Sequence, residues 1–539
     1  MFVDRLSSVY PHAHTLRSEE NMKNRFSQFT AAFAFVALLA LGTNSYATTT
    51  VSFNGVGATV LFNTFGLAAV STASCGTNVW TFKKGASGID GRSASIPPET
   101  GNIWIVWNSA VTTVCAYLAL DATVGAQLYF ATPRATLSIP SSEIGAAGAN
   151  LIPTLSDSAL PQAVYNALNG VAFNAAILDS RPEDALFSET RALAALDTVH
   201  YNGLGYGPGP IGNPIQSTFS SSSSTPVDFA IAGTDPISGE TVPAWTATEV
   251  GADAVIIFVN AGQTGSTGDF SNLAAFQNVN RFELSLALNG TLPYTQDLSP
   301  TTGLATEPLN VILRDPLSGT FNVLEFCIPR ALEIGSTQEL GVNPTATGGN
   351  PLDLTNAGGG WRKRALSSSE MVSQVGNDAN GNVLGYTFWS TGNFANVVGN
   401  TRYLTVDGVD PLFPSYAGGD FPTCTAPCPG IVTFTNIVNG SYPIWEIYRV
   451  VTAPKVPSGV SALISAAQTQ ASTTIPDFVP INQLEVFRSH YTLSGRTASD
   501  GVAPGTRESG GDVGGAVFPV QADLDYFTDT GKELTGYKQ

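Results

Sequence analysis

The chain has 539 residues, of which 43% are hydrophobic and 12% are charged. This composition is sufficient for large packed cores and argues against disorder along the whole chain, and the length favours two or three domains. Because 42 acidic residues outnumber 24 basic ones, with a formal net charge of -18, the composition argues against general binding of nucleic acid through a positive field. If the protein binds an anion, local hydrogen-bond donors must hold it.

The N-terminus has the pattern of an export signal. Residues 22–47 contain two basic residues, then an apolar stretch too short to span a bilayer, then "SYA", a small-x-Ala site for signal peptidase. We therefore predict that residues 1–47 comprise an upstream segment and a signal peptide, and that the mature chain begins near Thr48. The expected location is periplasmic or secreted.

Five cysteines would then lie in an oxidising compartment, where disulfide bonds persist. Cys424 and Cys428 are spaced to close a small loop, and Cys75 with Cys115 is a second candidate pair, but sequence alone leaves the connectivity open. Cys327 lies in an apolar segment, which favours a buried thiol. A zinc site is not favoured, because the two histidines of the predicted mature chain lie far from the cysteines in sequence.

From residue 51 the chain alternates strand-like runs ("IWIVWN", "AVIIFVN", "LNVILR") with helix-like runs ("PEDALFSETRALAAL", "FNVLEFCIPRALEI"). This alternation predicts the α/β class, with largely parallel sheets flanked by helices. Segments rich in Gly, Ser, Asn and Pro separate the runs. The longest, at 205–226, is interpreted as a surface loop.

One strand-to-helix junction concentrates groups that can bind an anion. The strand-like run "LNVILR" ends at Arg314, and Ser318, Gly319 and Thr320 precede apolar residues at helical spacing. Backbone N–H groups and small hydroxyl side chains at a helix start can bind an oxyanion, and an arginine adds charged donors. The alternative is that a hydroxyl only caps the helix and that the arginine is solvated.

Three further stretches could contribute to the same site. "FNGVGATVLFNTFG" places glycines and Thr59 after a strand-like start, which permits close backbone approach and supplies a hydroxyl donor. "KKGASGIDG" is a second glycine-rich loop and contains Ser87. In "FNAAILDSRPEDALF", Ser180 and Glu183 have capping-box spacing, which leaves Asp179 as a candidate ligand residue. Its alternative role is to stabilise the helix N-terminus.

These stretches, in this order, resemble the four ligand-binding segments of the phosphate-binding proteins of ABC importers. The shared features are Gly-x-Gly-Ala-Thr, a Gly-x-Ser-Gly loop, an Asp before a helix, and an Arg followed by Ser-Gly-Thr. The later stretches "GGGWRKRALSSSEMVSQVGNDANGNVLGYTFWS" and "IVNGSYPIWEIYRVV" are similar to that family as well. The resemblance spans most of residues 51–455.

The resemblance implies an α/β, two-lobed fold of the type II periplasmic-binding-protein kind, with the ligand between the lobes. Residues 48–259 would form the first part of lobe 1, with an insertion at about 92–170. Residues 260–437 would form lobe 2, and residues 438–539 would return to lobe 1 and add a C-terminal extension. The implied ligand-binding residues are Thr59, Val60, Ser87, Asp179, Arg314, Ser318, Gly319 and Thr320.

The sequence departs from the family pattern at two positions. Ala86 stands where the family usually has a serine, which leaves Ser87 as a substitute. Pro316 stands where the family usually has an acidic residue. The anion site is therefore better supported than the identity of the anion as phosphate.

The implied function is capture of phosphate or a similar oxyanion for ABC-type uptake, without catalysis, cofactor or metal. The expected partner is an ABC permease, and the expected state is a monomer. Asp179 can only accept hydrogen bonds when ionised, so it would favour hydrogen phosphate over sulfate. One alternative is a secreted surface or scaffold protein. A hydrolase is less favoured, because there is no Gly-x-Ser-x-Gly motif and neither His200 nor His490 has a catalytic context.

Two other features are interpreted structurally. The basic run at 362–364 predicts a solvated helix start, with attraction of anions as an alternative role. Trp361 and Trp389 are predicted to be packing residues rather than a platform for stacking a sugar.

Overall fold

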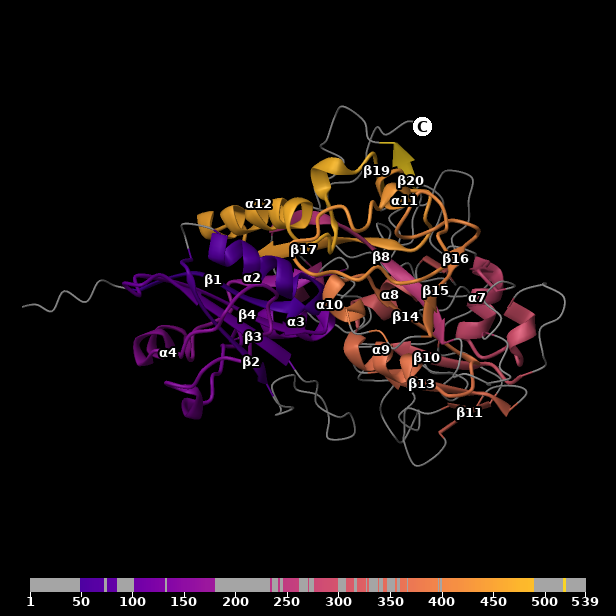
Figure 1. Cartoon of the computed structure of the whole chain (residues 1–539). Helices are drawn as coiled ribbons and strands as arrows, with labels where there is room; N and C mark the ends of the chain where they lie inside the picture. The colour runs from indigo at the N-terminus through magenta and orange to yellow at the C-terminus, as the bar shows by residue number, and fades with distance from the viewer. Residues whose placement is uncertain are drawn as a thin grey trace, which may run out of the picture. The chain divides into compact units, whose positions relative to one another are not determined.

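A computed structural model describes twenty segments of the chain: 49–71, 75–84, 101–130, 133–179, 233–234, 241–242, 246–260, 270, 276–298, 307–314, 318–325, 327–328, 338, 343–346, 354–355, 359–365, 367–395, 397, 400–488 and 517–519. The predicted signal peptide, the helix-like run at 182–196 and both histidines of the predicted mature chain lie outside these residues. The fold is mixed α/β, with a large sheet flanked by helices (Figure 1).

Within the described residues, most strands join one 14-stranded sheet. Its order is β11-β12-β13-β10-β14-β8-β17-β5-β1-β4-β3-β2, and β15 and β18 also pair with β8. The strands are β1 (Thr50–Ala58), β2 (Asn78–Lys84), β3 (Gly101–Trp107), β4 (Thr113–Leu120), β5 (Ala175–Leu178), β8 (Thr246–Asn260), β10 (Asn310–Arg314), β11 (Asn343–Ala346), β12 (Leu354–Thr355), β13 (Trp361–Ala365), β14 (Val383–Phe388), β15 (Thr401–Tyr403), β17 (Trp445–Thr452) and β18 (Val479–Pro480).

Short strands pair outside this sheet: β6 (Gly233–Thr234) with β7 (Thr241–Val242), β9 (Asn278–Val279) with β16 (Thr405–Val406), and β19 (Val486–Arg488) with β20 (Val517–Pro519). The described helices are α2 (Phe62–Ser71), α3 (Ala122–Phe130), α4 (Gln162–Leu168), α7 (Arg281–Leu288), α8 (Gly319–Glu325), α9 (Ser368–Gly376), α10 (Thr391–Phe394), α11 (Thr435–Val438) and α12 (Ser458–Thr473). Single 3₁₀ turns are η1 (Thr59–Leu61), η2 (Ser141–Glu143), η4 (Thr295–Leu298) and η7 (Ile481–Gln483).

Three neighbouring parallel strands, β4, β1 and β5, end at the same side of the sheet. β1 pairs in parallel with β4 on one side and with β5 on the other, with Ala58 opposite Leu120 and Gly57 opposite Ile177. The carboxyl ends of these strands therefore lie at the same edge. β3 and β4 fall within the range expected to be an insertion, and β4 lies directly against β1.

Glycines allow the closest approach between these elements. A Cβ at Gly57, whose φ is +130°, would lie 2.1 Å from the carbonyl oxygen of Ile177, so only glycine fits there. A Cβ at Gly125 on α3 would lie 2.3 Å from the Cα of Gly57. The backbone of α3 therefore packs directly on β1.

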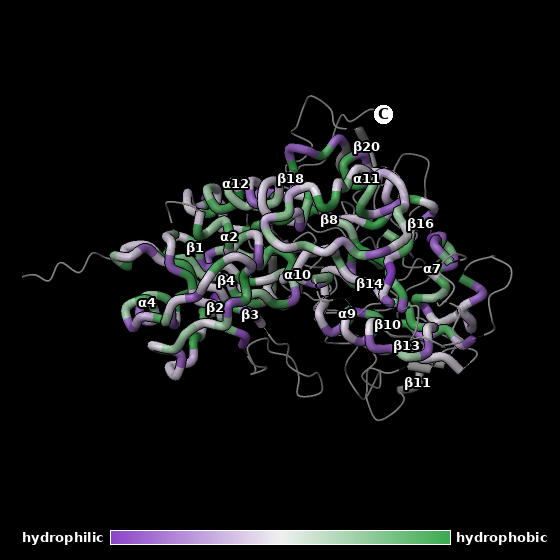
Figure 2. Tube along the Cα trace, in the orientation of Figure 1, coloured by the Kyte–Doolittle hydropathy of each residue, from purple (hydrophilic) through white to green (hydrophobic). Residues whose placement is uncertain are grey.

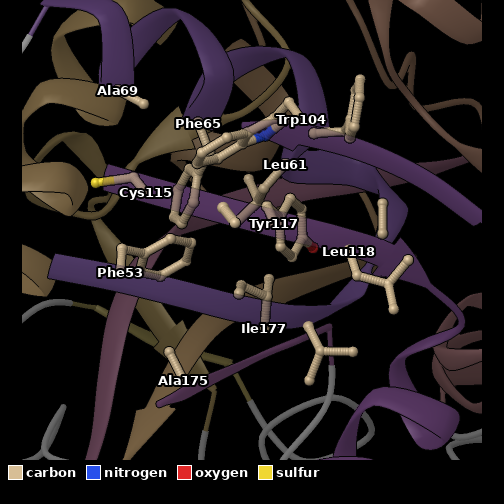
Figure 3. Packing of buried hydrophobic residues seen from close by; sticks show 14 of the residues in the cluster. Phe53, Leu61, Phe65, Ala69, Trp104, Cys115, Tyr117, Leu118, Ala175 and Ile177 are labelled. Carbon is tan, nitrogen blue, oxygen red and sulfur yellow. The ribbon is translucent and has the colours of Figure 1, made fainter. Parts of the chain in front are cut away.

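The first hydrophobic core lies between this part of the sheet and its helices (Figure 3). Phe53, Trp104 and Tyr117 are fully buried, with ring centroids 6.0 Å apart for Phe53 and Trp104 and 5.9 Å apart for Trp104 and Tyr117. Each such aromatic side chain buries a large apolar area, of order 150–250 Å². α12 packs beside α2 over the same core (Figure 1).

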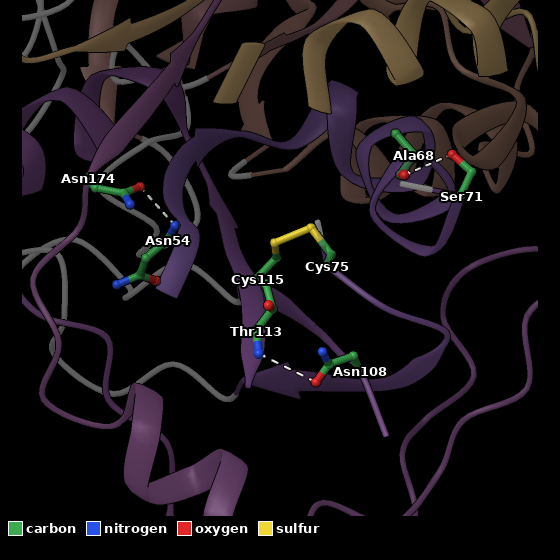
Figure 4. The surroundings of a disulfide bond; sticks show 8 residues. All are labelled: Asn54, Ala68, Ser71, Cys75, Asn108, Thr113, Cys115 and Asn174. Carbon is green, nitrogen blue, oxygen red and sulfur yellow. Dashed lines mark hydrogen bonds between the residues drawn. A yellow bond between two sulfur atoms is a disulfide. The ribbon is translucent and has the colours of Figure 1, made fainter. Parts of the chain in front are cut away.

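The structure settles the cysteine connectivity that the sequence left open, and both candidate pairs form disulfide bonds. Cys75, after α2, is bonded to Cys115 in β4 (Figure 4), and Cys424 is bonded to Cys428. Cys327 is buried and does not belong to a disulfide bond, as predicted.

The second hydrophobic core lies around β10, β14 and the second half of β8, where Val255–Val259 form a buried and strongly hydrophobic stretch (Figure 2). β8 pairs with β14 over this half and with β17 over its first half. The long strands β8 and β17 therefore contribute residues to both cores. Trp389 is fully buried and Trp361 packs against the second core, which confirms their predicted packing role.

The predicted solvated helix start at 362–364 is wrong. These residues belong to β13, which pairs in parallel with β10, and Arg362 is 0% exposed. Its Nη1 donates to the carbonyl oxygens of Leu288 (3.1 Å) and Gln338 (2.8 Å). The basic run suggested a solvated helix start, but these residues pair with β10 as a strand, and buried carbonyl oxygens accept hydrogen bonds from Arg362. The helix begins later, at α9, where Ser367 accepts a hydrogen bond from the backbone N–H of Glu370.

Candidate functional site

The common edge of β1, β4 and β5 presents one residue from each strand end. Thr59 follows β1, Asp121 follows β4 and Asp179 follows β5. Asp121 is 5% exposed and Asp179 is 4% exposed. Two buried carboxyl groups therefore lie at this edge, together with Thr59, which was predicted from the sequence to bind the ligand.

Arg314 reaches the same edge from the second core. It ends β10, is 2% exposed, and its Nη2 lies 3.0 Å from Oδ1 of Asp121. Its Nη1 donates to Oγ of Ser368 (2.9 Å), and its Nε donates to the carbonyl oxygen of Ala365 (3.3 Å). The alternative of a solvated arginine is therefore wrong. This guanidinium is buried, charge-paired and oriented by neutral acceptors.

Asp179 lies against the first turn of α8. A Cβ built on Gly319 would lie 1.5 Å from Oδ1 of Asp179, so only glycine leaves room for this carboxyl group. Burial raises the pKa of Asp179 from 3.8 to about 6, while its own backbone N–H and the charge of Arg314 lower the pKa. Oδ1 of Asp179 is buried and has no hydrogen-bond partner. An unpaired buried acceptor of this kind costs stability.

The hydroxyl residues of the α8 segment are also buried. Ser318 is 2% exposed, and its carbonyl oxygen accepts hydrogen bonds from the backbone N–H (3.3 Å) and Nδ2 (3.1 Å) of Asn322. Thr320 is 1% exposed, and its Oγ1 has no partner. The segment therefore adds an unused hydroxyl one residue from the glycine that contacts Asp179.

A cavity of about 570 Å³ lies next to Ser368, the hydrogen-bond partner of Arg314. Its wall includes Thr59 and Val60 after β1, and Ser368 at the start of α9. Because Ser368 accepts a hydrogen bond from Arg314, the cavity wall and the arginine are in direct contact. The other lining residues are Phe62, Asn63, Lys83, Asn102, Leu151, Ser367, Ser369, Glu370, Ser390, Gly392 and Asn393.

The predicted site residues fall into three groups. Arg314, Asp179 and Gly319 are brought together by direct contact or electrostatic interaction, with Ser318 and Thr320 adjacent in the α8 segment. Thr59 and Val60 line the cavity. Ser87, like Ala86 and Pro316, lies outside the described residues.

Sequence reasoning missed Asp121 and Ser368. Asp121 follows the apolar run "CAYLAL" and precedes a helix, which is the pattern that identified Asp179. The prediction for this region relied instead on the earlier glycine-rich loop "KKGASGIDG". In the sheet it is β4 that lies beside β1 in parallel, so β4 delivers the residue at this edge. Ser368 follows the helix cap Ser367, in a serine run that sequence alone does not distinguish from a surface segment.

The described residues contain no group of three or more His, Cys, Asp or Glu side chains arranged to hold a metal ion. Among the helices in this part of the chain, none combines the length and apolar character needed to cross a bilayer.

A scan against protein-family models and a search of curated proteins gave no match. A search of solved structures matched 28 chains. They include an ABC-type phosphate transport receptor from Vibrio cholerae, with 14% identity, coverage of 42% of this chain and 68% of that chain, and a TM-score of 0.25. A human phosphate binding apolipoprotein has 13% identity, coverage of 80% and 92%, and a TM-score of 0.33. A phosphate-binding protein from Stenotrophomonas maltophilia has 13% identity, coverage of 81% and 91%, and a TM-score of 0.31. Similarity at this level does not assign a ligand, so the ligand must be inferred from the residues of this chain.

Proposed function

We propose that this protein is a periplasmic or secreted solute-binding protein that captures an oxyanion, with phosphate as the expected ligand, and that it is not an enzyme. The two lobes would be residues 48–259 with 438–539 and residues 260–437, and the second half of β8 would extend across that boundary into the core of the second lobe. The ligand would lie where Arg314 and Asp179 meet.

One observation supports this proposal most strongly. Oδ1 of the buried Asp179 has no hydrogen-bond partner, although the positive charge of the buried Arg314 lowers the pKa of the same carboxyl group. A donor and an acceptor placed together fit a ligand that is anionic and still carries a proton. Hydrogen phosphate is such a ligand, since its P–OH group can donate to Oδ1 while its other oxygens accept hydrogen bonds. Sulfate is fully ionised near neutral pH and has no proton to donate.

The neighbouring groups support the same ligand. Arg314 supplies positive charge, and its contacts with Asp121 and Ser368 hold the guanidinium in one orientation. Oγ1 of Thr320 can donate a hydrogen bond that it does not make within the chain. Thr59 lies at the cavity wall. Hydrogen bonds to a charged oxyanion are stronger than those between neutral groups, at about 1.5–3 kcal/mol each.

Delivery to an ABC permease is the expected use of the captured anion, and a monomer is the expected state. Both rest on the resemblance of the sequence segments to phosphate-binding proteins of ABC importers. Transport is testable by deleting the gene and following phosphate uptake under phosphate limitation.

One observation favours a second candidate, a secreted surface or scaffold protein. Asp121 already supplies a carboxylate to Arg314 at 3.0 Å, so the arginine is charge-paired within the chain. If that pair is purely structural, the fold serves another purpose and no oxyanion binds. The two candidates therefore predict opposite results for anion binding by the purified protein.

Calorimetric titration of phosphate-free protein with phosphate and then sulfate tests the proposal. We expect phosphate to bind more tightly than sulfate, and Asp179→Asn to narrow that difference, because an asparagine no longer favours a ligand proton. Arg314→Ala should weaken phosphate binding roughly 10- to 100-fold, the equivalent of one charged hydrogen bond. Arg402→Ala, which breaks a partly exposed pair with Asp420, is the matched control and should leave binding unchanged. Absence of heat at several temperatures, from protein shown to be folded, would support the scaffold candidate.

A further inference from the structure

The cavity is much larger than an inorganic oxyanion requires. Its volume of about 570 Å³ equals that of roughly 19 molecules of liquid water at about 30 Å³ each. A tetrahedral oxyanion has the size of only a few water molecules. The volume instead falls in the range of small organic ligand sites, which is roughly 300–1,000 Å³.

The wall carries the groups that bind hydroxyls. Three asparagines line the cavity: Asn63 on α2, Asn102 on β3 and Asn393 on α10. Each amide offers both donors and an acceptor, as a polyhydroxylated ligand requires. Val60 and Phe62 add apolar surface, and Lys83 is an exposed cation at the wall.

One of these amides lacks a partner within the chain. Nδ2 of Asn393 is buried and makes no hydrogen bond, although the backbone N–H of the same residue donates to Oγ of Ser390 (2.9 Å). The preceding residue, Gly392, lies close to Asn63: a Cβ built on Gly392 would lie 2.8 Å from Nδ2 of Asn63, so α10 and α2 approach closely at this wall. A buried donor without an acceptor is costly. Because this nitrogen is itself buried, a ligand oxygen accepts a hydrogen bond from it only after the Asn393 side chain rotates toward the cavity.

The cavity also adjoins the proposed oxyanion position. Ser368 lines the cavity and accepts a hydrogen bond from Nη1 of Arg314. Arg314 and Asp179 do not themselves line the cavity, so a ligand whose anionic group binds them would extend past Ser368 into the cavity.

We propose that the ligand is a phosphate monoester of a polyhydroxylated molecule, such as a sugar phosphate, rather than inorganic phosphate alone. The phosphoryl group binds at Arg314 and Asp179, and the hydroxyls bind to the asparagine amides of the cavity. This inference rests on the proposed oxyanion function and names its substrate class. A phosphate monoester has a second pKa of about 6, so it carries the proton that Asp179 requires at and below about pH 6, which is the pH at which the esters are to be compared with phosphate.

Titration of the purified mature chain, from Thr48, with four ligands tests the inference without any substitution: sodium phosphate, glucose 1-phosphate, glycerol 3-phosphate and myo-inositol 1-phosphate. At least one ester is expected to bind tenfold or more tightly than phosphate. Phosphate binding that is as tight as that of all three esters would overturn the inference and leave the proposed function intact. Binding of none of the four by folded protein would overturn both.

Asparagine variants then locate the hydroxyl contacts. Asn102→Ala and Asn393→Ala are each expected to weaken ester binding roughly 3- to 10-fold, the value of one neutral hydrogen bond, and to leave phosphate binding unchanged. Asn166→Ala is the control, because Asn166 is exposed on α4 outside the cavity. Equal losses for ester and phosphate would place the organic group elsewhere and refute the assignment.

Discussion

Asp179→Asn should stabilise the protein near neutral pH and not at low pH. The carboxyl group is 4% exposed, and burial raises its pKa from 3.8 to about 6. Between these pH values the folded chain binds more protons than the unfolded chain, so stability falls as pH rises through the window. A difference of about two pH units corresponds to about 3 kcal/mol. Above pH 6 the charged side chain therefore lowers the free energy of unfolding by up to about 3 kcal/mol. An asparagine does not ionise, so the variant does not lose this stability.

The assay is urea unfolding of wild type and variant, without phosphate, at several pH values from 3.5 to 7.5. The informative quantity is the difference in unfolding free energy between the two proteins, because other buried acids such as Asp477 titrate in both. Burial raises the pKa of Asp477 to about 6 as well. We expect the difference to be near zero at pH 3.5 and to increase in favour of the variant up to pH 7.5. A difference that does not change with pH would refute the raised pKa of Asp179 in the folded state.

Three further predictions test the contacts around the site. Asp121→Asn leaves the buried charge of Arg314 without its carboxylate, so we expect a loss of about 3–5 kcal/mol in unfolding free energy; added phosphate should restore part of the thermal stability, and no restoration would argue against anion binding there. Gly319→Ala places a Cβ 1.5 Å from Oδ1 of Asp179, and overpacking should cost about 1–3 kcal/mol, a cost that a second change of Asp179 to Ala should relieve in a double-mutant cycle. Replacing both cysteines of the Cys75–Cys115 bond, which spans 40 residues, by alanine should lower stability by about 4 kcal/mol in chemical unfolding; an unchanged midpoint would contradict that account.

Local sequence patterns predicted several parts of this fold correctly. The apolar runs ending at Asn260 and Arg314 are strands β8 and β10, and the Ser-Gly-Thr segment does begin a helix. These elements are determined by nearby residues: a buried apolar run for the strands, and small residues followed by apolar residues at helical spacing for the helix. Gly319 could be placed beside Asp179 only because the resemblance supplied the order of the segments.

The rest of the site depends on strand order, which local patterns do not encode. Asp121 meets Arg314 because β4 lies beside β1 and brings its carboxyl end to the same edge. The residues between them in sequence give no sign of this, since 193 positions separate the two. Arg362 shows the same limit, because its burial follows from the pairing of β13 with β10.

The charge balance at the site limits which anions it can hold. Arg314 contributes one positive charge and Asp121 one negative charge, so the pair is close to neutral. Asp179 adds up to one further negative charge above pH 6. A fully ionised anion would then place several negative charges in a buried region with one guanidinium, and charges of like sign repel strongly where water is excluded. A ligand that shares a proton with Asp179 removes one of those charges and converts repulsion into a hydrogen bond. The electrostatics therefore favour a protonated oxyanion, whether free or esterified, over any anion that has already lost its last proton.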